Sequence, residues 1–185
     1  MEDEYSKIIQ EKDKAFSRDQ IKFISQQETS LRNQALFSIL YLTNSRVSEI
    51  TKRLRKNQIE IKNMNSKRYI LFKDLHTEKN RQHPLRNIPV LIEKEHPMAD
   101  IVLKYIELYN DNNLLFPISR QRAWQIIKKM CGQRCHYLRH SRLTHLMTEY
   151  GIGEVLLSRM AGWKDTRMAT TYVHLSWQDA AEMML

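Results

Sequence analysis

The chain has 185 residues, of which 42% are hydrophobic, and it contains only 4 glycines and 4 prolines. These values exclude a disordered chain, argue against an all-β protein, and favour one mostly helical domain with a real core. No apolar run is long enough to span a membrane, and the polar N-terminus is unlike a secretory signal. Two cysteines do not make a disulfide framework, so we expect a cytoplasmic protein that is not secreted.

The formal net charge of +9 is concentrated in the middle of the chain. Residues 46–86 carry a net charge of +8, whereas residues 1–45 carry −1 and residues 87–185 carry +2. Such a block suits a polyanion such as the DNA or RNA backbone, and a solvated basic face without a partner is the alternative. Because Ile, Leu, Tyr and Phe interrupt the charges, we favour nucleic acid as the partner.

The first predicted elements are helices. Ser17 followed by Gln20 is a capping-box pattern, so a helix is expected to begin near Arg18. Residues 31–42 are apolar almost all round, which is typical of a buried helix.

A third helix is predicted over residues 46–54, capped by Asn44 or Ser45, with Arg46 in its first turn. An arginine at this end meets the unfavourable positive pole of the helix dipole. Either a bound anion or an ion pair with Glu49 would compensate, and the sequence leaves both open.

After residue 54 the residue pattern changes from helical to that of short strands. Residues 57–63 and 67–72 have β-type alternation and are separated by a turn-like segment, and residues 85–92 form a third strand in which Pro89 favours an edge. We therefore expect a small three-stranded antiparallel sheet in a fold that is mainly α (α+β). Further helices are predicted at 98–109, 119–130, 136–149 (ending at Gly151), 154–160 and 177–184.

Two polar patterns lie in the second half of the chain. His136 and Arg139 are three residues apart and share one helix face, where a guanidinium could grip a phosphate and an imidazole could move a proton. A basic surface helix with a packed histidine is the alternative. Gly162 ends a helix, Trp163 follows it, and Tyr172 lies nine residues beyond Trp163, as a packing residue or as a nucleophile.

The order in which these patterns follow one another along the chain is more specific for one kind of protein than any single pattern. "LTNSRVSEI" resembles the first arginine motif of the tyrosine recombinase (phage integrase) family, and "HYLRHSRLTHL" resembles its His-x-x-Arg motif. "LLSRMAGWKDTRMATTYVHL" is similar to the family motif that ends in the nucleophile. The resemblance is to the catalytic domain and covers roughly residues 17 to 180.

The resemblance implies a catalytic role for each matching residue. Arg46 and Arg139 would hold the scissile phosphate, His136 would assist proton transfer, and Tyr172 would be the nucleophile. Trp163 lies where the family most often has histidine, and its indole can donate a hydrogen bond but cannot transfer a proton.

Other basic and acidic residues would assist. Glu49 would support Arg46, and Lys79 in the connection between the second and third strands would be the general acid, with Lys73 as the runner-up. The predicted DNA contacts are Lys73, Arg81, Arg86 and Arg142. Solvated hairpin charge is the alternative for this connection.

The chemistry needs neither metal nor ATP. A free tyrosine has a pKa of about 10, and two nearby arginines favour its phenolate and stabilise the charge of the phosphorane. The expected reaction is a transesterification that forms a 3′-phosphotyrosyl link and frees a 5′-hydroxyl. Guanidinium groups neutralise the charge that Mg²⁺ neutralises elsewhere, so no cofactor is expected.

We expect residues 1–16 to be an arm or linker remnant and residues 17–185 to form the catalytic-like domain, without the N-terminal domain with which the family clamps DNA. The expected partners are double-stranded DNA and further copies of the chain, as a tetramer on DNA. The amphipathic segment 177–185 would pack on a neighbouring protomer or on its own core.

Three alternatives remain. A type IB topoisomerase-like enzyme would form the same link and relax DNA without exchanging strands. A catalytically silent DNA-binding protein would keep only the fold. A zinc site could use Cys131, Cys135, His136 and His140, although Cys135 and His136 are adjacent and point to different helix faces.

Overall fold

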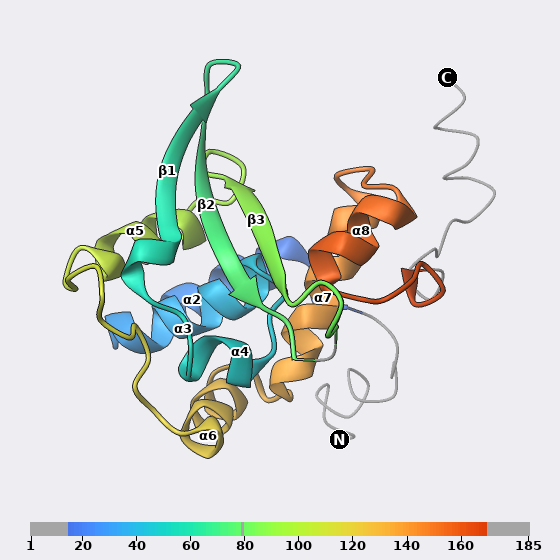
Figure 1. Cartoon of the computed structure of the whole chain (residues 1–185). Coiled ribbons are helices and arrows are strands. Elements are labelled where there is room, and N and C mark those ends of the chain that lie inside the picture. Colours follow the sequence, from blue (N-terminus) through green and yellow to red (C-terminus); the bar gives the residue numbers. More distant parts are fainter. Residues whose placement is uncertain (1–14, 79, 170–185) are drawn as a thin grey trace, which may run out of the picture.

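The computed structural model describes residues 15–78 and 80–169, in which a group of helices packs beside one small sheet (Figure 1). The helices are α2 (Arg18–Gln27), α3 (Leu31–Leu42), α4 (Val47–Thr51), α5 (Met98–Ile106), α6 (Arg120–Cys131), α7 (Cys135–Thr148) and α8 (Glu154–Ala161), with a 3-10 turn η1 (Lys56–Gln58). Strands β1 (Ile59–Met64), β2 (Lys67–His76) and β3 (Leu85–Leu91) form an antiparallel sheet in the order β1-β2-β3. The predicted fold class is confirmed.

Helix α3 is the centre of the helical part, where it contacts α2, α5, α6 and α7. Its residues 35–42 are all buried, because apolar side chains cover every face of this helix. Helix α2 begins at the predicted capping box, in which Ser17 Oγ accepts from the Gln20 N–H and the Gln20 side chain accepts from the Ser17 N–H. Both predictions for this region are confirmed.

The sheet follows from its turn and its alternation. Asn65 and Ser66 join β1 to β2 with positive φ values of 51° and 58°, which suits a two-residue hairpin turn. On β3, Ile88 and Val90 are buried, and Pro89 faces outward at the edge of the sheet, as predicted.

Strand β2 is longer than predicted. An irregularity between Phe72 and Leu75 accommodates an extra residue, and pairing with β3 resumes at Leu75 and His76. Asp74 takes a φ of 50° within this bulge. The longer strand carries the chain directly to the β2–β3 connection.

The later helices agree with prediction, with shifted ends. Helix α5 ends at Ile106 instead of residue 109, because the amides of Leu108 and Tyr109 bond three residues back and tighten the chain into turns. Gly151 follows α7 with a φ of 63°, and Gly162 caps α8 with a φ of 70°. The predicted helix at 177–184 lies outside the described residues. In the described part of the chain, no helix is long and apolar enough to cross a bilayer.

Candidate active site

Three of the predicted site segments meet around the side chain of Arg139. From α7, Arg139 Nη1 donates to the Asn44 carbonyl at 2.5 Å, and Nη2 donates to the Ala161 carbonyl at 2.8 Å. Its guanidinium lies 5.9 Å from the centre of the Trp163 ring. Arg139 therefore joins the turn before α4, which carries Arg46, to the end of α8.

Arg46 is placed differently from the prediction. It is the N-cap residue of α4, with extended φ and ψ of −76° and 152°, and the helix covers Val47–Thr51 instead of 46–54. Glu49 in the first turn accepts the Arg46 N–H at 2.9 Å and pairs with Arg46 Nη1 at 2.9 Å. Of the two possibilities that the sequence left open, the structure has the ion pair with Glu49. The Arg46 side chain remains 20% exposed.

The Glu49 carboxylate collects hydrogen bonds from three parts of the chain. Besides Arg46, it accepts from Arg86 Nη2 at 3.1 Å and from the Glu78 N–H at 3.2 Å. Burial opposes ionisation of this carboxyl, but Arg86, the Arg46 N–H and the Arg46 guanidinium outweigh it, so the pKa of Glu49 lies below its usual value. Glu49 is therefore ionised at neutral pH and fixes both arginines.

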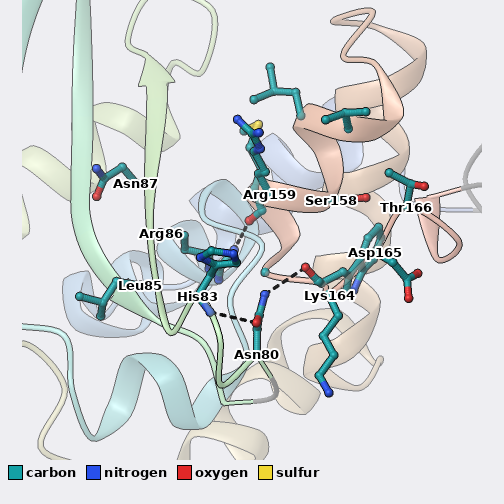
Figure 2. Close-up of a pocket in the computed structure, with 15 residues that line it drawn as sticks. Asn80, His83, Leu85, Arg86, Asn87, Ser158, Arg159, Lys164, Asp165 and Thr166 are labelled. Atoms are coloured by element: carbon teal, nitrogen blue, oxygen red, sulfur yellow. Dashed lines mark hydrogen bonds between the residues drawn. The ribbon is translucent and has the colours of Figure 1, made fainter.

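The β2–β3 connection is attached to the same centre on both sides of residue 79. The Glu78 N–H reaches Glu49, and Asn80 Nδ2 donates to the Trp163 carbonyl at 3.1 Å (Figure 2). Lys79 itself lies outside the described residues. Lys73 is on β2 and pairs with Glu60 on β1.

Two predicted DNA contacts are buried, and direct DNA contact does not fit their positions. Arg86 is 7% exposed and Arg142 is 2% exposed. Arg142 pairs with Glu95 at 2.5 Å. Burial lowers the pKa of Arg86 to about 10, which is still well above neutral pH, so Arg86 stays charged. The alternation of β3 was the missed signal, because Arg86 is in phase with the inward Ile88. Arg81, in the β2–β3 connection, is exposed.

The remaining predicted residues lie at the margin of this centre. His136 is exposed in the first turn of α7, one turn before the buried Arg139. Trp163 is half-buried directly after Gly162. Tyr172 lies outside the described residues. The structure thus brings Arg46, Arg139 and Trp163 to one place, next to the two neighbours of residue 79.

An open cavity of about 730 Å³ adjoins this centre between β3 and α8 (Figure 2). Polar and basic side chains line it beside exposed apolar ones: Asn80, His83, Asn87, Arg159 and Lys164, with Leu85, Val155 and Leu156. Trp163 forms part of its wall. The cavity is therefore continuous with the site.

The proposed zinc ligands do not fit a metal. Among the described residues, no group of three or more His, Cys, Asp or Glu side chains could hold an ion. Burial raises the pKa of the Cys131 thiol, and raises that of Cys135 to about 11, whereas zinc binds thiolates. Both cysteines are free of a disulfide bond.

The fold is similar to that of solved DNA recombinases. The XerA recombinase has a TM-score of 0.64 and is 18% identical over 92% of this chain and 61% of its own. The XerH recombinase bound to difH substrate has a TM-score of 0.59 and is 18% identical over 92% of this chain and 53% of its own. The Tn1549 transposon integrase, in complex with transposon right end DNA, has a TM-score of 0.57 and is 18% identical over 93% of this chain and 65% of its own.

The chain thus spans about half to two thirds of the length of these structures. A comparison with curated protein sequences gave no match. Residues 2–179 match the sequence profile of the phage integrase family, which is nearly the whole chain. The protein therefore belongs to the phage integrase family.

Proposed function

We propose that this protein is a DNA strand-transferase that cleaves and rejoins double-stranded DNA through a 3′-phosphotyrosyl link at Tyr172. The observation that carries the proposal is the bond from Arg139 to the Asn44 carbonyl, which spans 95 residues of sequence and ends two residues before Arg46. Two arginines at one turn suit the two non-bridging oxygens of a phosphate. Membership of the phage integrase family supports the same conclusion.

The reaction balances with residues of this chain alone. The Tyr172 oxygen attacks phosphorus, its proton goes to His136, and the bond from phosphorus to the 5′ oxygen breaks. Lys79 gives a proton to the leaving oxygen, which becomes a 5′-hydroxyl. Arg46 and Arg139 stabilise the extra negative charge of the phosphorane. The phosphotyrosyl link keeps the bond energy, so rejoining needs no ATP.

The electrostatics of the site favour an anion. Arg46 and Arg86 share Glu49 as their only carboxylate partner among the described residues, which leaves the trio one positive charge in excess. A partly buried surplus charge is costly without a counter-ion, and a phosphate supplies one. Since Arg139 is 2% exposed, its contact with phosphate requires a local rearrangement when DNA binds.

The test does not require the target sequence in advance. A library of nicked, randomised duplexes is incubated with the protein, denatured, and washed, and the DNA that stays attached is counted and sequenced. We expect attachment with the wild-type protein and none with Tyr172→Phe, which removes only the nucleophilic oxygen. Attachment that persists in Tyr172→Phe contradicts the proposal.

The general acid is tested separately. We propose Lys79 because both neighbours of this residue bond to the site, through Glu49 and the Trp163 carbonyl, whereas Lys73 is paired with Glu60. A substrate with sulfur in place of the 5′ bridging oxygen has a leaving group that needs no proton. Lys79→Ala should be rescued by this substrate and Lys73→Ala should not; the reverse result assigns the role to Lys73.

Strand exchange separates a recombinase from a relaxing enzyme. Exchange between two duplexes cuts four strands, which needs four tyrosines, so we propose a homo-tetramer on DNA that uses segment 177–185. Recombinant products from two sites, and a mass of four protomers on DNA, are expected. Relaxation of supercoils without recombinants would support the topoisomerase-like alternative. Deletion of 177–185 should abolish the four-protomer complex.

A further inference from the structure

Arg86 on β3 lies between the same two segments as Arg139, which are residues 43–46 and the end of α8; we call the contact between these segments the site joint. Arg86 Nη1 donates to Asn44 Oδ1 at 2.6 Å, to the Thr43 carbonyl at 3.2 Å, and to the carbonyl of Met160. Arg139 bonds the carbonyls of Asn44 and Ala161. Two guanidinium groups from different elements therefore connect the same two segments, the turn at residues 43–46 and the end of α8. Figure 2 shows Arg86 between β3 and α8.

The other terminal nitrogen of Arg86 reaches the N-terminal end of α4, which Arg46 caps. Arg86 Nη2 donates to Ser45 Oγ at 2.8 Å and to Glu49 Oε2 at 3.1 Å, and Glu49 also holds the Arg46 N–H and guanidinium. Both terminal nitrogens of Arg86 are bonded to protein, one of them to the Glu49 carboxylate, and 7% of the residue is exposed, so we treat Arg86 as a contact within the protein. Its effect on the reaction has to pass through other residues.

The end of α8 also touches the β2–β3 connection directly. A Cβ on Gly162 would lie 2.4 Å from Thr77 Cγ2 and 3.6 Å from Arg86 Cδ, which leaves no room between these segments. Trp163, next in the chain, receives the bond from Asn80. A small shift of α8 would therefore move Trp163 and the β2–β3 connection relative to Arg46.

We propose that Arg86 is a positioning residue, which holds the segment bearing Arg46 and the segment bearing Trp163 in the one relative geometry that strand cleavage needs. The proposal rests on the proposed function for its link to cleavage. A lysine has one charged nitrogen and cannot span acceptors on both segments as the planar guanidinium does. Arg86→Lys thus preserves the charge opposite Glu49 and removes the bridge.

The first experiment compares Arg86→Lys with a matched control. Glu95→Gln disturbs the other buried arginine pair, between Glu95 and Arg142, which shares no residue with the ion pairs of Glu49. Misplacement of catalytic groups by about 1 Å can cost about 100-fold in rate. We expect Arg86→Lys to slow covalent attachment about 10- to 100-fold at saturating DNA, with unchanged DNA affinity, and Glu95→Gln to retain the wild-type rate per folded molecule.

The second experiment asks through which residue Arg86 acts. If it acts by placing Arg46, Arg86→Lys has less effect in an Arg46→Ala background than in the wild type. Three results would overturn the proposal. The rate losses of Arg86→Lys and Arg46→Ala could multiply independently in the double variant. Alternatively, Arg86→Lys could keep the wild-type rate, or lose rate only in proportion to its folded fraction. Asn44→Gly is a milder second variant, since glycine keeps the φ of 46° and removes one acceptor of Arg86. It should reduce the rate less than Arg86→Lys.

A readout without DNA distinguishes failure of this inference from failure of the proposed function. Hydrogen exchange is measured at the Arg46 amide, which donates to Glu49, and at the Trp163 amide, which donates to the Ser158 carbonyl at 3.0 Å. Arg86→Lys should speed exchange at both amides by more than its loss of global stability explains, whereas in Glu95→Gln any change should follow the global stability alone. If the wild type never attaches to DNA, the proposed function is wrong. If hydrogen exchange at the two amides is unchanged in Arg86→Lys, the positioning role is wrong, whether or not the wild type attaches to DNA.

Discussion

Two clusters of buried charge in this protein look alike and differ in balance. The site cluster is Glu49 with Arg46 and Arg86; the distal cluster is Glu95 with Arg18, Arg142 and Glu149. Their central carboxylates, Glu49 and Glu95, are 2% and 0% exposed. In the distal cluster two arginines meet two carboxylates, at N–O distances of 2.5, 3.4 and 3.3 Å, whereas in the site cluster two arginines share one carboxylate.

The difference in charge balance indicates that the distal cluster stabilises the fold and that the site cluster is suited to bind a ligand. The balanced distal cluster ties the start of α2 to α7 and to the segment before α5, and Tyr150 also donates to Glu95. It needs no further partner. The site cluster keeps a surplus positive charge and a half-buried Arg46, and its Arg86 lines the open cavity. A surplus charge held near the surface is a reason to expect an anionic ligand there, and a cluster whose charges balance is not.

The largest expected effect is on catalysis and is confined to the site cluster. Arg46→Ala should lower the rate of covalent attachment about 100- to 1,000-fold, because one charge that stabilises the phosphorane is removed. The rate is measured in single turnover with saturating nicked DNA. An equal loss in Glu95→Gln, corrected for the folded fraction, would erase the distinction between the clusters.

The next effect is on stability and belongs to the distal cluster. Glu95→Gln leaves the Arg142 charge buried without its partner, which should lower the free energy of unfolding by about 3–5 kcal/mol. Urea unfolding measures the change. Replacing both partners, as Glu95→Gln with Arg142→Met, should cost less than Glu95→Gln alone, and an additive cost would contradict a direct pair.

A glycine pair tests how tightly the site joint is packed. Gly162 and Gly132 both have a φ of 70°, so alanine at either is strained by about 1–3 kcal/mol. Only at Gly162 does the new Cβ meet an atom, Thr77 Cγ2 at 2.4 Å; at Gly132 nothing lies within 4 Å. Gly162→Ala should therefore destabilise more than Gly132→Ala in urea unfolding, and Thr77→Ser should remove most of the excess. Equal costs would mean that the joint can open.

The smallest expected effect is the pH dependence of stability near the distal cluster. Burial lowers the pKa of His145, against the opposing charge of Glu149, and Tyr41 Oη lies 2.8 Å from His145 Nδ1. The unfolded chain therefore takes up this proton first. The contribution is present above the usual pKa of 6.5 and is lost as the pH falls through that value towards the folded pKa.

Unfolding free energies from pH 8 to pH 5 measure this loss. The window lies above the usual carboxyl pKa of 4.5, so Glu49 and Glu95, whose pKa values are lowered, stay ionised in it. His145→Gln should lose less stability across the window than the wild type does. An identical slope in both proteins would show that His145 does not contribute.

Local patterns in the sequence were sufficient for the elements. The Ser17–Gln20 capping box, the all-round apolar residues 31–42 and the alternation of 85–92 each fix one element with short-range information. Burial of Arg86 could have been inferred from the alternation of β3. Burial of Arg142 could not, because a basic residue near a motif looks the same whether it meets DNA or Glu95. Only the chain fold brings Glu95 to Arg142, 47 residues away.

For the candidate site, the sequence indicated which residues lie together but not the contacts that hold them. The motif order identified Arg46, Arg139 and Trp163, and the structure brings them together. Three contributors were missed: Asn44, whose carbonyl and side chain anchor both buried arginines, the Arg86 bridge, and the Asn80 contact to Trp163. These are contacts between distant segments, and no local spacing encodes them.

The strongest single test identifies the atom to which DNA becomes joined. Wild-type protein attached to DNA is digested with protease and nuclease, and the nucleotide-bearing peptide is sequenced by mass spectrometry. We predict a phosphate on Tyr172, within residues 161–175, joined to the 3′ end of the cut strand. A nucleotide on any other residue, or protein that cuts DNA without becoming attached, would contradict the proposed chemistry.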